Sequence, residues 1–160
     1  MNRLRRWGIV LMLGAGLASA PAFGLPSKQT PSSTEKAKSL FDEGYAHQEA
    51  GEYEQAIDAY EQSLTHDPKQ AEALNNLGFC YKSLKRYHKA IDYYKDAIEL
   101  KPDLAQAHEY LAEAYLALNK IEMAKREYRV LLRLNPDEAK ELKKKIHEAL
   151  NQASPPEPAP

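Results

Sequence analysis

The sequence has little of what disulfide-stapled folds, zinc-binding folds and nucleic-acid binders require. It contains a single cysteine in 160 residues, which excludes an internal disulfide framework and a Cys-rich zinc site. Its formal net charge is −1, so it lacks the excess of Lys and Arg that neutralises a phosphate backbone. We therefore expect no nucleic acid among its partners.

The chain also lacks an apolar run long enough to cross a membrane. The longest run, Trp7 to Ala18, has about a dozen residues, whereas a spanning helix needs about 20. Three arginines precede it and small residues follow it, which is the order of a secretory signal peptide. We expect residues 1–24 to be removed after Ala22 or Gly24, giving an exported protein, periplasmic or secreted. If the segment is retained, it would instead anchor the protein to a membrane.

Signals for catalysis are missing as well. The five histidines are never three or four residues apart, so no single helix presents two of them as metal ligands. There is no glycine-rich phosphate loop and no nucleophile elbow, and Cys80 has no evident histidine partner. We expect no enzyme activity, no metal, no cofactor and no small-molecule substrate. Cys80 is expected to be buried, although an unpaired thiol leaves a disulfide-linked homodimer open.

What the sequence does contain is a repeat. The dipeptides Asp67-Pro68, Lys101-Pro102 and Asn135-Pro136 recur at one constant spacing. In the same register small residues recur at Gly44, Gly78 and Ala112, alanines at Ala56, Ala90 and Ala124, and tyrosines at Tyr60, Tyr94 and Tyr128. A period of about 34 indicates one supersecondary unit that is stacked on copies of itself to bury its apolar face.

Each unit has the apolar spacing of two helices. In the second unit Leu74, Leu77 and Tyr81 lie at steps of three and four, and a similar stripe follows Tyr87. Gly51 and Asn119 occupy the position of the turn in units one and three, where a left-handed backbone is tolerated, and Lys85 departs from this pattern. Each proline is expected to end a helix pair.

The second unit carries a family resemblance. It reads Leu74-x2-Leu77-Gly78-x2-Tyr81, followed by Ala90, Tyr94, Ala97 and Pro102, and this order resembles the tetratricopeptide repeat. The first unit departs from the family pattern at Glu43, His47 and Ser63, and the third at His108, Ala112 and Leu131. The resemblance implies an all-α fold, an α-solenoid of helix-turn-helix repeats whose concave face is lined by the first helix of each pair.

The predicted organisation follows from the period and from composition. Residues 139–150 have an apolar stripe and a polar remainder, as a capping helix requires, and the two flanks are too polar and too rich in Pro to fold. The expected segments are a signal peptide (1–24), a disordered linker (25–36), three repeats (37–70, 71–104 and 105–138), a C-terminal capping helix (139–150) and a disordered Pro-rich tail (151–160).

The resemblance places a partner-binding groove on the concave face. The positions it implies are Lys38, Phe41, Tyr45, Glu49, Glu72, Asn75, Asn76, Phe79, Lys82, Gln106, Glu109 and Glu113. Equivalent positions of successive repeats form a column. Among the implied residues, Phe41, Tyr45 and Phe79 lie outside the columns that pack helix pairs, and aromatic side chains are typical binding anchors. Phe41 and Tyr45 have a second interpretation, which is that they cover the open end of the first helix.

One subset of the family grips the carboxylate of a chaperone peptide with basic and Asn residues. The corresponding positions here are Phe41, Tyr45, Asn76, Gln106 and Tyr110, and only Asn76 fits. The predicted groove has two Lys and four Glu around an aromatic patch. We therefore expect a partner segment, a peptide or a helix, that is apolar and neutral to basic.

The sequence thus predicts an exported, non-enzymatic adaptor or scaffold that binds a partner protein in its groove. A self-associating or membrane-tethered structural module of the cell envelope is the alternative.

Overall fold

The computed structural model describes residues 30–153, all of them helices and short connections. The described helices belong to one compact unit, Pro31–Pro160. The predicted signal peptide and most of the predicted Pro-rich tail lie outside the described residues. Among the described helices, none combines the length and the apolar character needed to cross a membrane.

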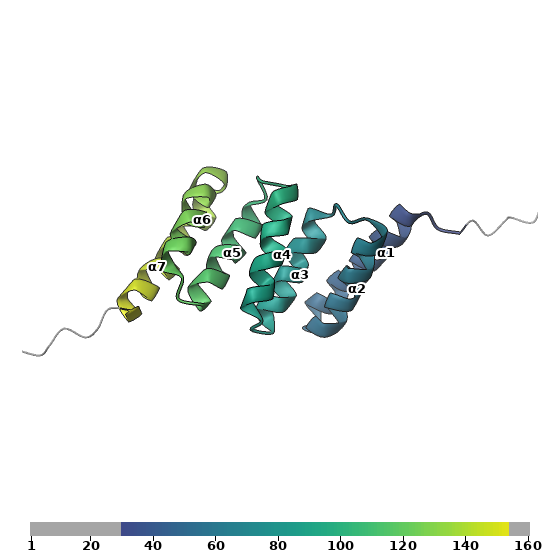
Figure 1. Cartoon of the computed structure of the whole chain (residues 1–160), viewed down its shortest axis with the longest axis horizontal. Coiled ribbons are helices and arrows are strands. Elements are labelled where there is room, and N and C mark those ends of the chain that lie inside the picture. The colour runs from purple at the N-terminus through teal and green to yellow at the C-terminus, as the bar shows by residue number, and fades with distance from the viewer. Residues whose placement is uncertain (1–29, 154–160) are drawn as a thin grey trace, which may run out of the picture. The chain divides into compact units, whose positions relative to one another are not determined.

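The helices follow one another as three pairs and a final single helix (Figure 1). Their bounds are α1 (Ser33–Glu49), α2 (Tyr53–His66), α3 (Ala71–Ser83), α4 (Tyr87–Leu100), α5 (Ala105–Ala117), α6 (Ile121–Leu134) and α7 (Pro136–Ala153). The part of the chain that is described contains no strand. The predicted all-α solenoid of three repeats and a capping helix is therefore confirmed.

The turn inside each pair is built the same way three times. Gly51, Lys85 and Asn119 have φ of 76°, 59° and 56°. The residue after each one donates its N–H to a carbonyl five positions back, as Glu52 does to His47 at 2.9 Å and Arg86 does to Tyr81 at 2.8 Å. This closure requires a left-handed residue after the first helix. Lys85 departs from the pattern in sequence, but its backbone follows that of Gly51 and Asn119.

The first helix begins earlier than the sequence predicted. The expected linker ended at residue 36, but α1 starts at Ser33. Ser32 accepts the N–H of Glu35, and the Glu35 carboxylate accepts the N–H of Ser32 at 2.7 Å. This capping box satisfies two backbone donors and fixes the start of the helix inside the segment predicted to be disordered.

The capping helix also extends beyond its predicted bounds of 139–150. Pro136 is its first residue rather than a break after the third repeat, because a proline fits the first helical turn. Asn135 accepts the N–H of Glu138 through its side chain at 3.3 Å and so caps the new helix. The helix continues to Ala153, inside the segment assigned to the tail.

The helices form an inner and an outer row. Contacts join α1 to α3, α3 to α5 and α5 to α7, whereas α2, α4 and α6 contact only helices that adjoin them in sequence. The first helix of each pair, together with α7, therefore forms the tighter inner side of the array. This is the side on which the groove was predicted.

Glycines let the two helices of a pair approach each other. A Cβ built on Gly44 would lie 2.8 Å from the Tyr60 ring, and one on Gly78 would lie 2.6 Å from the Tyr94 ring. Both rings are fully buried. The glycine column thus faces the tyrosine column directly, which the sequence had only placed side by side.

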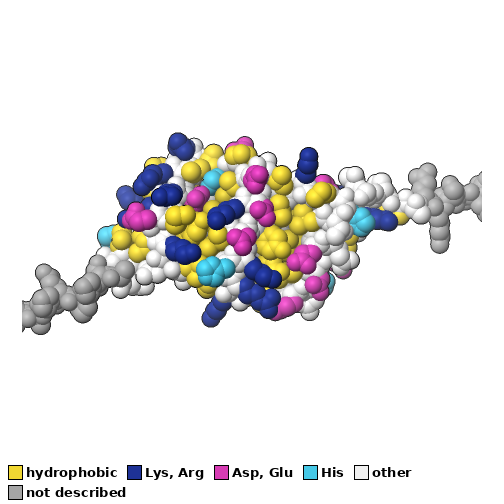
Figure 2. All heavy atoms as spheres, viewed as in Figure 1, with side chains coloured by type: hydrophobic (Ala, Val, Ile, Leu, Met, Phe, Trp, Pro, Cys, Tyr) yellow, Lys and Arg dark blue, Asp and Glu magenta, His cyan; other side chains and the backbone are white. Residues whose placement is uncertain are grey.

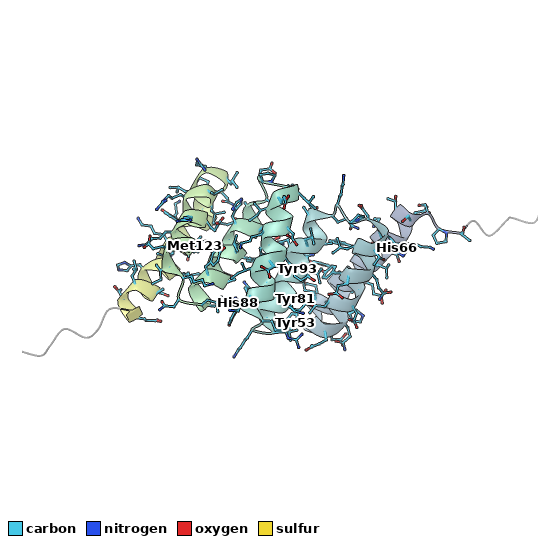
Figure 3. All side chains as sticks on the ribbon, viewed as in Figure 1. Tyr53, His66, Tyr81, His88, Tyr93 and Met123 are labelled. Atoms are coloured by element: carbon cyan, nitrogen blue, oxygen red, sulfur yellow. The ribbon has the colours of Figure 1, made fainter. Side chains whose placement is uncertain are left out.

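A tyrosine stack lies within the second pair and is hydrogen-bonded to the first pair. Tyr81 of α3 and Tyr93 of α4 lie face to face with ring centroids 5.3 Å apart (Figure 3). The Tyr81 hydroxyl donates to Glu61 of α2 at 3.2 Å. The stack packs the two helices of the second pair together, and the hydrogen bond ties that pair to the first.

Cys80 and His108 are both buried in the helix packing. Cys80 is fully buried, and burial raises the pKa of its thiol to about 12. A disulfide between two copies would require opening of the repeat, which disfavours the dimer that the lone cysteine had left open. His108 is buried between α5 and α6, where its ring nitrogens lie 2.8 Å from Glu127 and 2.9 Å from the Pro102 carbonyl.

Candidate functional site

A hollow of about 540 Å³ opens on the inner side, over α1, α3 and the start of α5. We call it the aromatic hollow. Its lining is Phe41, Asp42, Tyr45, Gln48, Glu49, Glu72, Asn75, Asn76, Phe79, Gln106 and Tyr110. Eight of the twelve predicted groove residues are in this set, so the helical columns bring most of the predicted site together.

The other four predicted residues lie beside the hollow. Lys38 lines an adjoining hollow of about 300 Å³ that shares Phe41 and Glu72 with the first. Lys82 and Glu113 pair with each other, and Glu109 is half-buried near them. The predicted groove residues are therefore spread over the aromatic hollow, the adjoining hollow and a third hollow of about 330 Å³ that Glu113 lines together with Leu116 and Lys145.

Two lining residues that the predicted set left out, Asp42 and Tyr110, lie in the same column as Asn76, which it included. Asp42, Asn76 and Tyr110 hold the same position in successive repeats, and all three line the hollow. The predicted set took Asn76 from this column but not its equivalents in the first and third repeats. Applying the column to every repeat would have found them. Gln48, which lies in the column of Lys82, also lines the hollow.

Aromatic rings give the hollow its walls. Phe79 lies between Tyr53 and Tyr110, with ring centroids 6.3 Å and 5.5 Å away. Phe41 packs on the buried Tyr60 ring at 5.5 Å, so this residue partly covers the first pair, as its second interpretation had it. Tyr45 is 49% exposed and has no ring partner among the described aromatics. Two anchored rings and one exposed ring thus face the same space.

Amide side chains form the floor. Asn75 donates to Gln106 at 3.0 Å, and Gln106 donates to the Tyr110 hydroxyl at 3.2 Å. Asn76 donates to the Tyr60 hydroxyl, also at 3.2 Å. These bonds fix the side chains before any partner arrives.

Asn75 differs from its prediction as a surface contact. It is only 1% exposed, because α3 and α5 enclose it, and its Oδ1 has no hydrogen-bond partner within residues 30–153. Its role in this structure is to orient Gln106. A buried acceptor without a partner is costly, so this atom is the least satisfied polar group of the floor.

The charge of the lining is negative. Asp42, Glu49 and Glu72 contribute carboxylates, and no Lys or Arg is among the lining residues. Asp42 pairs with Lys38 at 2.7 Å and Glu72 with Lys101 at 2.8 Å, both from the rim. The hydrogen bond from Lys101 lowers the pKa of Glu72, which keeps this carboxylate charged. Glu49 forms no ion pair with any described residue.

An ion-pair network spans the C-terminal part of the inner side. Glu113 of α5 is held by Lys82 of α3 and by Lys145 of α7. Burial favours the neutral acid, but hydrogen bonds from Lys145 and Lys82 outweigh it and lower the pKa of Glu113. Lys82 is therefore engaged, contrary to its prediction as a groove contact. Glu109 beside the network has a raised pKa because of burial and the charge of Glu113.

Lys82 also shows what the rings accept. Its Nζ lies 4.2 Å from the centroid of the Tyr110 ring and 5.5 Å from that of Phe79. An ammonium group over an aromatic face is stabilised by the ring quadrupole. The edge of the hollow already holds a cation in this way. Within residues 30–153, no three His, Cys, Asp or Glu side chains converge as a metal site would require.

Three family models together match residues 44–138, with a gap at residue 105. The tetratricopeptide repeat model matches residues 71–104, a TPR repeat model matches 44–85, and a further tetratricopeptide repeat model matches 106–138. None of these models describes an enzyme. The full sequence matches no curated protein.

Solved structures agree with the models. The first TPR of Spaghetti (RPAP3), bound to the HSP90 peptide SRMEEVD, is 31% identical with a TM-score of 0.70, covering 74% of this chain and 95% of that one. The first TPR domain of human RPAP3 is 30% identical with a TM-score of 0.69, covering 73% and 94%. The Arabidopsis OM64 TPR domain, at 18% identity, a TM-score of 0.70 and coverage of 72% and 98%, supports the fold alone. The chain belongs to the tetratricopeptide repeat family.

Proposed function

We propose that this protein is a non-enzymatic adaptor that holds a segment of a partner protein in the aromatic hollow. The observation that carries the proposal is the composition of that hollow, where four aromatic rings and three carboxylates line one space without a lysine or arginine. A concave site with ordered aromatic walls and a few polar groups is typical of binding sites.

The rings supply the anchors. Phe79 is held between two other rings, and Tyr45 is half exposed at the mouth, so a partner side chain that enters between them buries aromatic surface with little loss of rotamer freedom. The amide floor is already hydrogen-bonded and needs no rearrangement.

The charges select the partner. The related Spaghetti domain binds SRMEEVD, an acidic peptide. Here Glu49, which has no ion pair with a described residue, would repel such a peptide, whereas Asp42 and Glu72 are paired with Lys38 and Lys101. The positions that could be basic hold Phe41, Tyr45, Gln106 and Tyr110 instead. The cation that Lys82 places over the neighbouring rings supports a partner with Lys or Arg beside apolar residues. We infer a neutral to basic apolar segment with a Kd of about 1 µM, as suits a small interface.

Export is part of the proposal. It is supported by the three arginines, the short apolar run and the small residues of positions 1–24. N-terminal sequencing of the protein purified from the cells that make it is expected to find a chain that begins after Ala22 or Gly24. An intact N-terminus on protein confined to the cytosol would contradict export.

Selection from a random-peptide display library tests the binding function. We expect the wild-type protein to enrich peptides that combine apolar residues with Lys or Arg, and the double variant Tyr45→Ala/Phe79→Ala to lose them. Leu100→Ala, which removes an exposed side chain outside the hollow, is the control and should select the same peptides as the wild type. Enrichment of acidic peptides, or enrichment that survives the double variant, would contradict the proposal.

Light scattering separates the adaptor from the alternative module. A monomer across the concentration range is expected for an adaptor, and a concentration-dependent dimer would favour self-association.

A further inference from the structure

Three exposed leucines lie in the last turns of α4 and α6, at the edge of the outer row where these helices end. Leu100 ends α4 and is 42% exposed; Leu132 and Leu134 end α6 and are 46% and 38% exposed. Leu100 and Leu134 hold equivalent positions in neighbouring repeats, where the first repeat has His66. The edge is therefore a property of the second and third repeats rather than of the repeat as such.

Arginines lie beside these leucines. Arg126, Arg129 and Arg133 are spaced so that they share one face of α6, opposite the buried Ala124 and Leu131. All three are exposed, and none forms a hydrogen bond or ion pair within the described part of the chain. The acid that they influence is Glu122, one turn earlier, whose carboxylate is already bonded to Lys125 at 2.7 Å.

The charge at the positions of these three arginines changes along the array of repeats. The equivalent residues are Asp58, Glu61 and Thr65 in α2 and Asp92, Lys95 and Glu99 in α4. The outer side is thus acidic or mixed over the first two pairs and basic over α6. Figure 2 shows Lys and Arg side chains gathered at the end where α6 and α7 lie.

We propose that this edge, Arg126, Arg129 and Arg133 with Leu100, Leu132 and Leu134, docks on a membrane surface of anionic phospholipids. The guanidinium groups match lipid phosphates in charge and geometry, and each basic residue near an anionic leaflet adds to the attraction. The leucines lie in the last turns of α4 and α6, and exposed apolar side chains beside a basic face can enter the headgroup region. The aromatic hollow lies on the inner side, so its occupancy is independent of this contact.

The mixture of groups favours lipid over an acidic protein. A purely electrostatic partner would be served by the arginines alone and would leave the three leucines in water. Anionic phospholipid presents phosphates above acyl chains, so a single surface satisfies both kinds of side chain.

Vesicle co-sedimentation of the full chain tests the proposal. We expect the wild type to bind phosphatidylglycerol vesicles more tightly than phosphatidylcholine vesicles. Arg126→Gln/Arg129→Gln/Arg133→Gln should weaken binding to the anionic vesicles about tenfold or more. Residues 1–24 are present in both proteins, so the difference between them reports on the edge. Circular dichroism of the variant, whose changes are all exposed, is expected to match the wild type.

A control of equal charge removes the effect of net charge. Lys36→Gln/Lys69→Gln/Lys85→Gln takes the same number of positive charges from other exposed positions and should leave vesicle binding within about twofold. Leu132→Ser/Leu134→Ser should weaken binding to anionic vesicles at high salt, where the arginines are screened. Equal losses in the two triple variants, no preference for anionic vesicles, or binding of soluble polyglutamate without binding of vesicles would each overturn the proposal.

Discussion

The second and third repeats share a backbone and differ in the side chains that they turn inward. Both pairs close through a left-handed residue, Lys85 and Asn119. In the same inner column, however, α3 carries Phe79 and α5 carries Glu113. Phe79 lines the aromatic hollow, whereas Glu113 is held by lysines from the helices on either side. The column fixes where a side chain points, and its chemistry decides whether it lines an aromatic hollow or joins an ion-pair network there.

The difference extends to the core. Gly78 of the second repeat lies under the buried Tyr94, while the third repeat has Ala112 in this column and a Tyr128 that is only partly buried. Leu74 of the second repeat is replaced by His108, which adds two hydrogen bonds. The second repeat thus depends on close packing, and the third depends more on polar contacts.

The packing of the second repeat is the feature whose loss should cost most. Gly78→Leu forces a side chain against the Tyr94 ring and should lower the free energy of unfolding by about 1–3 kcal/mol. Urea denaturation measures this change. Gln62→Leu, at an exposed position of α2, is the control and should stay within about 0.5 kcal/mol. An unchanged stability for Gly78→Leu would mean that the glycine column does not bring the helices together.

The ion-pair network of the third repeat should come next. Glu113→Gln leaves Lys82 and Lys145 without their carboxylate, and we expect a loss of about 1–2 kcal/mol, since Lys82 is only 18% exposed. Glu49→Gln changes a carboxylate without an ion pair in the open hollow and should stay within about 0.5 kcal/mol. Equal effects of the two variants in thermal melts would contradict a stabilising role for the Glu113 ion pairs.

The histidine of the third repeat should make stability depend on pH. The hydrogen bond to Glu127 raises the pKa of His108 above its ordinary value of 6.5, against the effect of burial and with help from the Pro102 carbonyl. A group whose pKa is raised on folding stabilises the fold fully below its unfolded pKa and loses that contribution as pH rises through the folded pKa. We expect stability to fall across this window by about 1 kcal/mol, the scale of one charged hydrogen bond.

A variant that tests the role of His108 replaces it with the residue at the equivalent position of the second repeat. His108→Leu, which copies Leu74, should flatten the decline of stability with pH above 6.5. Denaturant melts at several pH values give the comparison. If the variant and the wild type decline in parallel, His108 is not the group that titrates.

The smallest effect is expected at the turn of the second repeat. Lys85 has a left-handed backbone at φ 59°, which a side chain strains, so Lys85→Gly should raise the free energy of unfolding by about 0.5–1 kcal/mol. Gly51→Ala places a side chain on the equivalent backbone and should lower it by a similar amount. Melting temperatures that move in the same direction for both variants would contradict this account of the turn.

The fold could be predicted because the residues that recur with the period are buried or lie next to helix ends. Tyr60, Tyr94 and the three prolines recur with the period of the repeat, and each recurrence corresponds to a helix pair in the structure. The start of α1 could not be found from the period, because it depends on the local capping box of Ser32 and Glu35. The start of α7 depends in the same way on the Asn135 cap.

The site was predicted less completely, because a residue's column fixes the direction of its side chain but not the residues that the side chain contacts. Lys82 and Glu113 were both correctly directed inward, yet whether they face a ligand depends on the reach of Lys82 and Lys145 across neighbouring helices. The burial of Asn75 depends likewise on how closely α5 approaches α3. Such contacts join residues of neighbouring units and are absent from any single repeat.

The measurement that tests the central claim most directly is calorimetric titration of the wild type and Tyr45→Ala/Phe79→Ala with the peptide most enriched by the display selection. We predict a Kd for the wild type of about 1 µM and a Kd at least about tenfold higher for the double variant, which circular dichroism is expected to show as folded at the temperature of the titration. Equal affinities for the two proteins would contradict the claim that the aromatic hollow is where the partner binds.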